Sequence, residues 1–274
     1  MPEAQDIGWL APGGPLGALT GASRVRARES ALARAELEVI CASLAPAPRF
    51  SDALRGERVA VIAELKRSSP SKGTLDEGLV AAERTRRYVA GGAAALSILT
   101  EPSRFGGSLA DLREARASVG VPLLRKDFVT HPTQLLEARA YGASAVLLIA
   151  RALPPTELSL LAQEAVAVGL EPLIEVRDEA ELARAIAVPE ALIGVNNRDL
   201  ETLVIHPDVG ARLIPRVPSD RIAVYESGIA DVAGVMAAAR AGADAVLVGS
   251  VLSVAENPEA LLREFTAVAR RARD

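Results

Sequence analysis

The chain has 274 residues, half of them hydrophobic, so it can bury the core of one α/β barrel of about 250 residues. Aromatic residues make up only 3% of the sequence and the net charge is −4, with both signs mixed along the chain, which argues against a nucleic-acid-binding surface. No apolar run approaches the roughly 18 residues of a membrane helix, and the opening MPEAQD lacks the basic start of a signal peptide.

The single cysteine, Cys41, cannot form an intrachain disulfide, which fits a reducing cytoplasm. The two histidines, His131 and His206, are far apart and have no ligand-type spacing. We therefore predict a cytoplasmic protein with no metal site and no membrane contact.

The N-terminal part of the chain divides into two stretches. Residues 1–22 are rich in Gly and Pro and are expected to be irregular. Residues 23–44 carry Ala, Leu and charged residues at helical spacing, and APAPRF then ends the helix. We predict an N-terminal extension over residues 1–57, irregular and then helical, followed by a catalytic domain over residues 58–274.

A regular alternation of strands and helices follows the extension. Short apolar runs predict eight strands, at 58–65, 94–100, 121–128, 145–150, 172–176, 191–197, 222–227 and 244–250. Stretches with helical periodicity lie between them, and apolar strands separated by helices are typical of a parallel sheet. A (β/α)8 TIM barrel is the predicted fold. A doubly wound open sheet is the alternative, but the turn KRSSPSKG after the first strand has neither a GxGxxG nor a Walker pattern.

Polar side chains end most of the predicted strands. Glu64 and Lys66 lie two residues apart and therefore on one face of the first strand. Charges within or next to apolar runs are costly unless they are paired or used. Because the carboxyl ends of barrel strands meet at one mouth, we predict a charged pocket there. Its candidate residues are Glu64, Lys66, Lys126, Glu175, Asn196, Arg198 and Glu226. The fourth strand, which ends LLIARAL, supplies an apolar wall.

The last two strands end in glycine and serine. ESGIA and VGSVLS place Ser227, Gly228, Gly249 and Ser250 where barrel enzymes bind phosphate through backbone N–H groups. The segment 69–71, Ser-Pro-Ser, has hydroxyl groups for an anion at the end of the first strand. These features predict a small phosphorylated substrate.

The same segments, in this order, resemble the indole-3-glycerol phosphate synthase family. The resemblance extends from about residue 48 to about residue 260 and is carried by VIAELKRSSPSKG, LTEPSRFGGSLADL, LLRKDF, QLLEARAYGASAVLLI, PLIEV, IGVNNRDLETL, ESGI and VLVGS. It implies ring closure of 1-(o-carboxyphenylamino)-1-deoxyribulose 5-phosphate to indole-3-glycerol phosphate, with release of carbon dioxide and water, in tryptophan biosynthesis. No cofactor is implied, and other tryptophan-pathway enzymes become candidate partners.

The resemblance also implies roles for individual residues. Lys126 corresponds to the family's catalytic lysine and Glu175 to its strand-5 glutamate, which we interpret as general acid and general base. Lys66 binds the substrate carboxylate or acts as a second acid, and Glu64 orients the lysines. Contacts with the substrate are implied for Asn196, Arg198, Ser69, Phe105, Glu226, Ser227, Gly228, Gly249 and Ser250, with Phe105 beside the anthranilate ring.

The sequence departs from the family pattern at two places, and two alternative functions have to be compared with the synthase. The segment before Ser23 does not look like the family's N-terminal helix. Tyr225 is bulkier than the small residue expected before Glu226, which is neutral for the pocket if its side chain faces the helices.

Phosphoribosylanthranilate isomerase pairs a cysteine with an aspartate, and here the only cysteine, Cys41, lies before the barrel. A non-catalytic phosphate-binding paralogue would lack the lysine or the glutamate, and neither is missing.

Overall fold

The computed structural model describes residues 8–30, 34–69, 73–76 and 78–273. Within these ranges eight parallel strands close into a barrel in the order β1-β10-β9-β8-β7-β6-β5-β4. The strands are β1 (Ala60–Leu65), β4 (Ala95–Leu99), β5 (Leu123–Lys126), β6 (Ala145–Ile149), β7 (Glu171–Val176), β8 (Leu192–Asn196), β9 (Ala223–Glu226) and β10 (Ala245–Val248). The predicted (β/α)8 barrel is confirmed, and every predicted strand overlaps an observed one.

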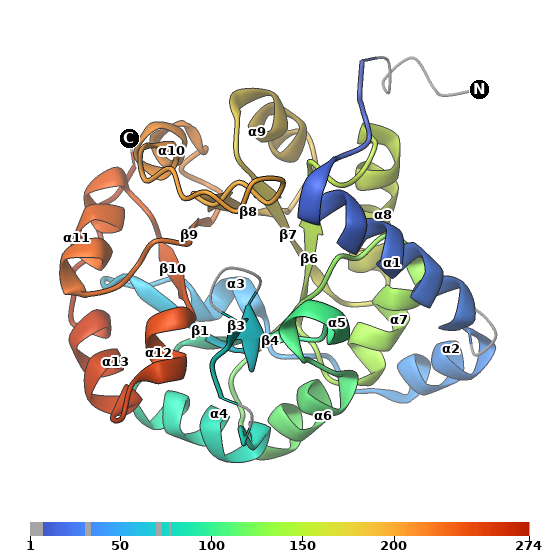
Figure 1. Cartoon of the computed structure of the whole chain (residues 1–274), viewed down its shortest axis with the longest axis horizontal. Coiled ribbons are helices and arrows are strands. Elements are labelled where there is room, and N and C mark those ends of the chain that lie inside the picture. Colours follow the sequence, from blue (N-terminus) through green and yellow to red (C-terminus); the bar gives the residue numbers. More distant parts are fainter. Residues whose placement is uncertain (1–7, 31–33, 70–72, 77, 274) are drawn as a thin grey trace.

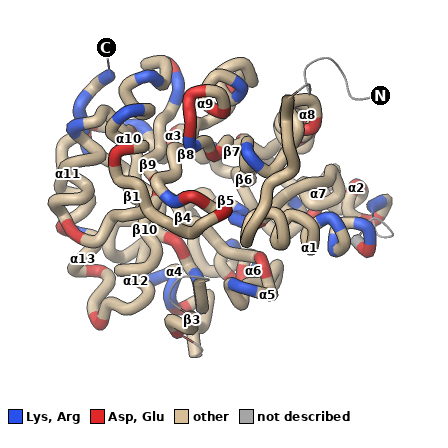
Figure 2. Tube along the Cα trace, turned by 45° about the horizontal axis from the view of Figure 1, so that its top comes forward, with Lys and Arg blue, Asp and Glu red and all other residues tan. Residues whose placement is uncertain are grey.

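Helices surround the barrel as a ring (Figure 1). Those that follow the strands are α4 (Ala81–Ala90), α5 (Pro102–Phe105), α6 (Leu109–Ser118), α7 (Pro132–Ala140), α8 (Pro155–Ala167), α9 (Glu179–Ile186), α10 (Asp208–Leu213) with η3 (Ile214–Arg216), α11 (Val232–Ala241), α12 (Ser250–Val254) and α13 (Pro258–Thr266). Lys and Arg are interspersed with Asp and Glu around this ring (Figure 2). No described helix is long and apolar enough to cross a membrane.

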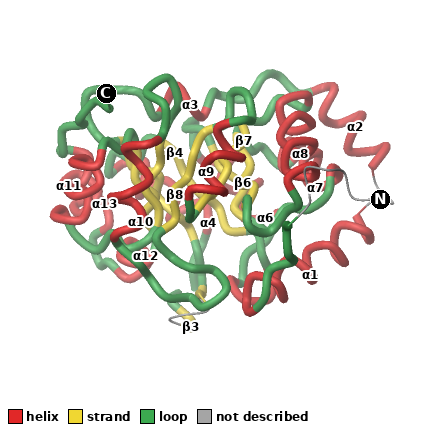
Figure 3. Tube along the Cα trace, turned by 90° about the horizontal axis from the view of Figure 1, so that it is seen from above, coloured by secondary structure: helices red, strands yellow, loops and turns green. Residues whose placement is uncertain are grey.

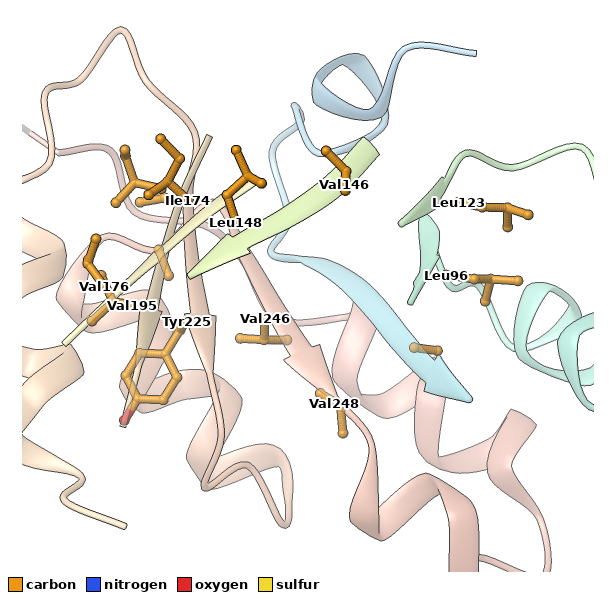
Figure 4. Packing of buried hydrophobic residues seen from close by; sticks show 14 of the residues in the cluster. Leu96, Leu123, Val146, Leu148, Ile174, Val176, Val195, Tyr225, Val246 and Val248 are labelled. Atoms are coloured by element: carbon orange, nitrogen blue, oxygen red, sulfur yellow. The ribbon is translucent and has the colours of Figure 1, made fainter. Parts of the chain in front are cut away.

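Alternation along the strands produces two cores. Leu65 and its neighbours in phase face the helices and form a large outer cluster, part of which Figure 4 shows from β4 to β10. Residues of the other phase, such as Ile62 and Leu247, fill the barrel interior. The same alternation turns Glu64 inward at the end of β1. The packed interior thus leaves the carboxyl mouth as the place where polar groups gather.

A short helix, α3 (Phe50–Ala53), closes the amino end of the barrel. Phe50 and Leu54 are fully buried against the interior core. The backbone N–H groups of Phe50 and Ser51 donate to the carboxylate of Glu171, at the start of β7. In Figure 3, α3 lies at the opposite end of the barrel from α1.

The N-terminal extension is more helical than predicted. Helix α1 spans Gly14–Ser30, so the expectation of irregular structure up to residue 22 is wrong for its second half; residues 1–7 lie outside the described part. Leu16 and Leu19 are buried against the barrel interior, and Leu16 N donates to Leu200 O at 3.1 Å. Tertiary packing therefore stabilises a helix that the local Gly-rich composition disfavours. The second helix, α2 (Arg34–Ser43), lies inside the predicted helical stretch and packs on α7.

A small hairpin after β1 was not predicted. It pairs β2 (Ser68–Ser69) with β3 (Gly73–Thr74) in antiparallel fashion. Residues 70–72, including Ser71 of the predicted anion-binding loop, lie outside the described residues. The division into an extension and a catalytic domain at residue 57 stays a prediction.

Candidate active site

A cavity of about 320 Å³ opens at the carboxyl ends of the strands. Every residue predicted from the sequence to form the site lines it, except Ser69. Apolar side chains from the strand ends and the following loops complete the wall, namely Leu99, Phe128, Leu147, Ile149, Leu200, Ile205, Ile229, Ala230 and Leu247. Leu147 and Ile149 form the apolar wall that was expected from the fourth barrel strand.

Lys126 lies between two carboxylates on the floor of this cavity. Its Nζ is 2.7 Å from Oε2 of Glu226 and 3.3 Å from Oε2 of Glu175. The three residues come from β5, β9 and β7, so closure of the barrel brings them together. All three side chains are largely buried, which strengthens their electrostatic coupling.

Burial and charge act in opposite directions on these groups. Burial would lower the pKa of the Lys126 ammonium, but the carboxylates of Glu226 and Glu175 outweigh it and raise that pKa above its ordinary value. Lys126 is therefore cationic at neutral pH. For Glu226, burial and the charge of Glu175 outweigh Lys126 and raise the pKa to about 7. This carboxyl can thus carry a proton near physiological pH.

A second ion pair ends β1. Lys66 Nζ donates to Glu64 Oε1 at 2.6 Å, which confirms that the two side chains point to one place. Burial would raise the pKa of Glu64, but the charges of Lys66 and Lys126 outweigh it, so the pKa lies below its ordinary value. Gly249 leaves room for this pair, because a Cβ there would lie under 3.0 Å from both Glu64 Oε1 and Lys66 Nζ.

Two phenylalanines form the aromatic part of the wall. Phe105 and Phe128 have ring centroids 6.4 Å apart with an interplanar angle of 36°. Phe105 was predicted, whereas Phe128 was missed. The signal for Phe128 was its position directly after a predicted strand that ends in charged residues, at the carboxyl mouth of the barrel.

The loop after β8 forms one side of the mouth. Asn196 Oδ1 accepts a hydrogen bond from Arg198 N at 2.9 Å, and Arg198 Nη1 donates to Leu203 O at 2.8 Å. Asn197 points away from the cavity and donates to the backbone carbonyls of Glu226 and Ser227. These contacts tie the β8 and β9 loops together, so that Asn196 and Arg198 face the cavity from a fixed turn.

The loops after β9 and β10 form the neighbouring part of the rim. Ser227 and Gly228 follow one another with φ of 65° and 86°, a left-handed turn that favours glycine at the second position. Gly249 and Ser250 lead directly into α12. Ser69 lies outside the cavity lining and is buried, and its hydroxyl has no hydrogen-bond partner among the described residues.

Tyr225 faces the helices, as the sequence allowed. Its ring packs where Gly210 has no side chain, and its hydroxyl donates weakly to Pro207 O at 3.4 Å. The bulky residue before Glu226 therefore leaves the cavity unchanged. Across the described ranges, no group of three or more His, Cys, Asp or Glu side chains is arranged to hold a metal ion.

The closed parallel barrel and the buried acid–base groups at its carboxyl mouth define an enzyme of the (β/α)8 class. Solved barrel structures show the same fold: 3-hexulose-6-phosphate synthase from Salmonella typhimurium has a TM-score of 0.61 at 15% identity, covering 76% of this chain and 97% of that one. Tryptophan synthase subunit alpha from Legionella pneumophila has a TM-score of 0.56 at 17% identity, covering 76% and 92%.

Sequence comparison identifies the family. The chain belongs to the indole-3-glycerol phosphate synthase family, whose family model matches residues 20–265. Curated relatives with that name include one from Nocardioides sp. (strain ATCC BAA-499 / JS614), 50% identical over 88% of this chain and 93% of the relative. Another from Opitutus terrae is 47% identical over 85% and 90%. These findings favour the synthase over phosphoribosylanthranilate isomerase, which was the alternative barrel enzyme.

Proposed function

We propose that the chain closes the indole ring of indole-3-glycerol phosphate, using 1-(o-carboxyphenylamino)-1-deoxyribulose 5-phosphate as substrate and acting in tryptophan biosynthesis. The observation that carries the proposal is the buried Lys126 ammonium held between Glu175 and Glu226 in the cavity. Membership of the family supplies the reaction, and the site supplies acid, base and anion-binding groups for it.

The substrate is a polyanion with an aromatic ring, and the cavity offers a complement to each part. The phosphate binds at the rim made by Ser227, Gly228, Gly249 and Ser250, where backbone N–H groups and hydroxyls can donate. The anthranilate ring lies against Phe105 and the adjacent apolar wall. Lys66 and Arg198 bring the positive charge that a carboxylate requires.

In the first chemical step, the ring carbon that bears the carboxylate attacks the C2′ carbonyl of the ribulose chain. A carbon–carbon bond forms and negative charge develops on the carbonyl oxygen. Lys126 donates a proton to this oxygen. An alkoxide is more basic than an amine, so even a lysine whose pKa is raised can protonate it. Loss of carbon dioxide then restores aromaticity.

The second step removes water. The hydroxyl at C2′ leaves after protonation, while a base takes the proton from C1′ and the pyrrole double bond forms. Glu175 is the base in this proposal, and Lys66, paired with Glu64, either protonates the leaving hydroxyl or binds the carboxylate in the first step. Asn196 and Arg198 contact substrate oxygens from the β8 loop. The support for these roles is their convergence on one cavity.

We also propose that the chain acts in the cytoplasm, and that other enzymes of the tryptophan pathway are its metabolic partners. A chain with a single cysteine needs no oxidising compartment.

The decisive experiment is a fluorescence assay for indole-3-glycerol phosphate with the purified protein, the carboxyphenylamino-deoxyribulose phosphate and EDTA. We expect product at an ordinary enzymatic rate, unchanged by the chelator. Tight substrate binding without product would instead indicate a phosphate-ligand-binding paralogue. Product only without EDTA would contradict the metal-free proton-transfer mechanism.

A further inference from the structure

Gly194 occupies an unusual place for a glycine, the middle of β8. Its neighbours in register are Glu175 on β7 and Val224 on β9. Glycine weakens a strand interior because it has no side chain to pack, so a glycine there signals close approach of another group. Gly194 does not line the cavity, and the catalytic proposal does not use it.

The approaching group is the carboxylate of Glu226. A Cβ atom on Gly194 would lie under 3.0 Å from Glu226 Oε1 and 3.3 Å from its Cδ, with Leu173 Cδ1 at 3.5 Å. Glu226 Oε1 is buried without a hydrogen-bond partner among the described residues, while Oε2 accepts from Lys126. One oxygen of the Glu226 carboxylate therefore lies beside Gly194, and the other accepts a hydrogen bond from Lys126.

We propose that Gly194 is a positioning residue: its missing side chain forms a notch that seats the Glu226 carboxylate at hydrogen-bond distance from Lys126. The inference rests on the proposed function, because it assigns the notch to the acid–base group of that reaction. Glu226 is 1% exposed, and its carboxylate borders the cavity. A methyl group in the notch therefore pushes the carboxylate out of the notch and away from its place beside Lys126.

The displacement has a specific kinetic signature. Lys126 would keep its contact with Glu175 but lose its shorter contact with Glu226. Proton transfer from Lys126 would then be impaired, because the ammonium is no longer held in its position. A misplacement of about 1 Å can cost about a hundredfold in rate. The rim residues and Phe105, which bind the phosphate and the ring, are untouched. For Gly194→Ala we expect kcat to fall by about ten- to a hundredfold, with KM changed less than about threefold.

Gly91→Ala is the matched control. A Cβ at Gly91 would lie 2.8 Å from Leu262 Cβ and 2.9 Å from Glu259 Cα, between α4 and α13 and away from the cavity. Its backbone, with φ of −79°, tolerates alanine. Crowding here lowers Tm by several degrees and leaves kcat at the wild-type value. A Gly194→Ala protein that likewise loses only Tm would overturn the positioning role.

A double-mutant cycle with Glu226→Ala tests whether Gly194 acts through Glu226. Without the glutamate side chain the added methyl meets no carboxylate, so Gly194→Ala should cost nothing further in kcat or in Tm on that background. Equal losses of both on the wild-type and Glu226→Ala backgrounds would refute the notch.

The Tm arm of the cycle needs no substrate, so it separates the two proposals. If the wild type forms no indole-3-glycerol phosphate, the proposed function fails while the Tm arm still decides the notch. If the wild type is active and Tm losses are additive, the notch fails and the function stands. If Glu226→Ala is inactive, the Tm arm again decides.

Discussion

The two cavity lysines differ in their partners. Lys126 contacts two carboxylates, whereas Lys66 contacts one. An ammonium held from two sides is fixed in direction as well as in charge, which suits a proton donor. Lys66, which directly follows β1, retains N–H donors for a substrate anion.

Lys126→Ala is expected to lower kcat by at least about a hundredfold, the usual scale for a general acid. The protein should still fold but with a lower Tm, because Glu175 and Glu226 lose their buried cation; the indole fluorescence assay and a Tm measurement check the two statements. The surface variant Arg34→Ala, whose ion pair is exposed, is the control and should keep full activity. Near-normal turnover of a folded Lys126→Ala protein would refute the acid role.

Glu226 predicts a pH dependence of stability. Its pKa is raised from 4.5 to about 7, so between these pH values the folded chain keeps a proton that the unfolded chain releases. The stability from this group is full below about pH 4.5 and is lost as pH rises toward 7. The neutral variant Glu226→Gln lacks this loss.

The measurement is urea unfolding of the wild type and Glu226→Gln from pH 5 to 8. The free energy of unfolding of the wild type minus that of the variant should decrease as pH rises. Glu181, whose pKa is also raised to about 7, chiefly by burial, is present in both proteins and cancels. A difference that is flat or increases with pH would contradict the assignment.

At the scale of elements, α5 shows how a short helix presents a cavity residue. Glu101 is its N-cap and accepts from Ser103 N at 2.9 Å, Arg104 N at 2.7 Å and Phe105 N at 3.2 Å. Arg26 of α1 pairs with the same carboxylate at 3.6 Å. One buried carboxylate thus orients the turn that carries Phe105.

Glu101→Ala should loosen that turn. Loss of an N-cap costs about 0.5–2 kcal/mol, which corresponds to a KM increase of about two- to thirtyfold if the cost falls on Phe105. We expect kcat to change less, because Lys126 and Glu175 lie on other strands. Steady-state kinetics decide this, with Glu101→Gln, which keeps one acceptor oxygen, as the milder variant. A kcat loss at constant KM would disprove the link to ring binding.

Elements with strong periodicity were predictable, and those held by tertiary contacts were not. The eight strands follow from apolar runs, and alternation at Glu64 and Lys66 gave their common face. The start of α1 was missed because Leu16 and Leu19 stabilise it by packing on residues far along the chain. The sequence likewise did not predict which carboxylate pairs with Lys126. That pairing depends on the position of the Glu226 carboxylate beside Gly194, which no local pattern encodes.

For the molecule as a whole, the two ends of the barrel have different tasks. The carboxyl end contains the cavity, and at the amino end the C-terminal segment of the chain is bound to the barrel. There Asp244 accepts from Arg270 at 2.5 Å, from Arg273 at 2.8 Å and from Ala223 N at 2.8 Å. Val59 N donates to Val268 O nearby, so the C-terminal segment is fastened beside β1 and β10.

Asp244→Ala should therefore reduce stability without reducing catalysis. It leaves the buried Arg273 guanidinium without its carboxylate, a loss of about 3–5 kcal/mol, or roughly 6–15 °C in Tm. Calorimetry and kinetics at a temperature well below Tm test both parts. The exposed pair of Arg212 with Glu179 is the control, and Arg212→Ala should cost below about 1 kcal/mol. Loss of kcat in a folded Asp244→Ala protein would contradict the separation of the two ends.

The unpartnered oxygen of Glu226 has a consequence for the evolution of the chain. A buried carboxylate with a raised pKa and a glycine in mid-strand both reduce stability, so each is retained only while turnover is under selection. In a laboratory selection for heat resistance alone, apolar residues at position 226 and larger residues at position 194 should accumulate together and early. The result would be a more stable barrel that no longer makes indole-3-glycerol phosphate.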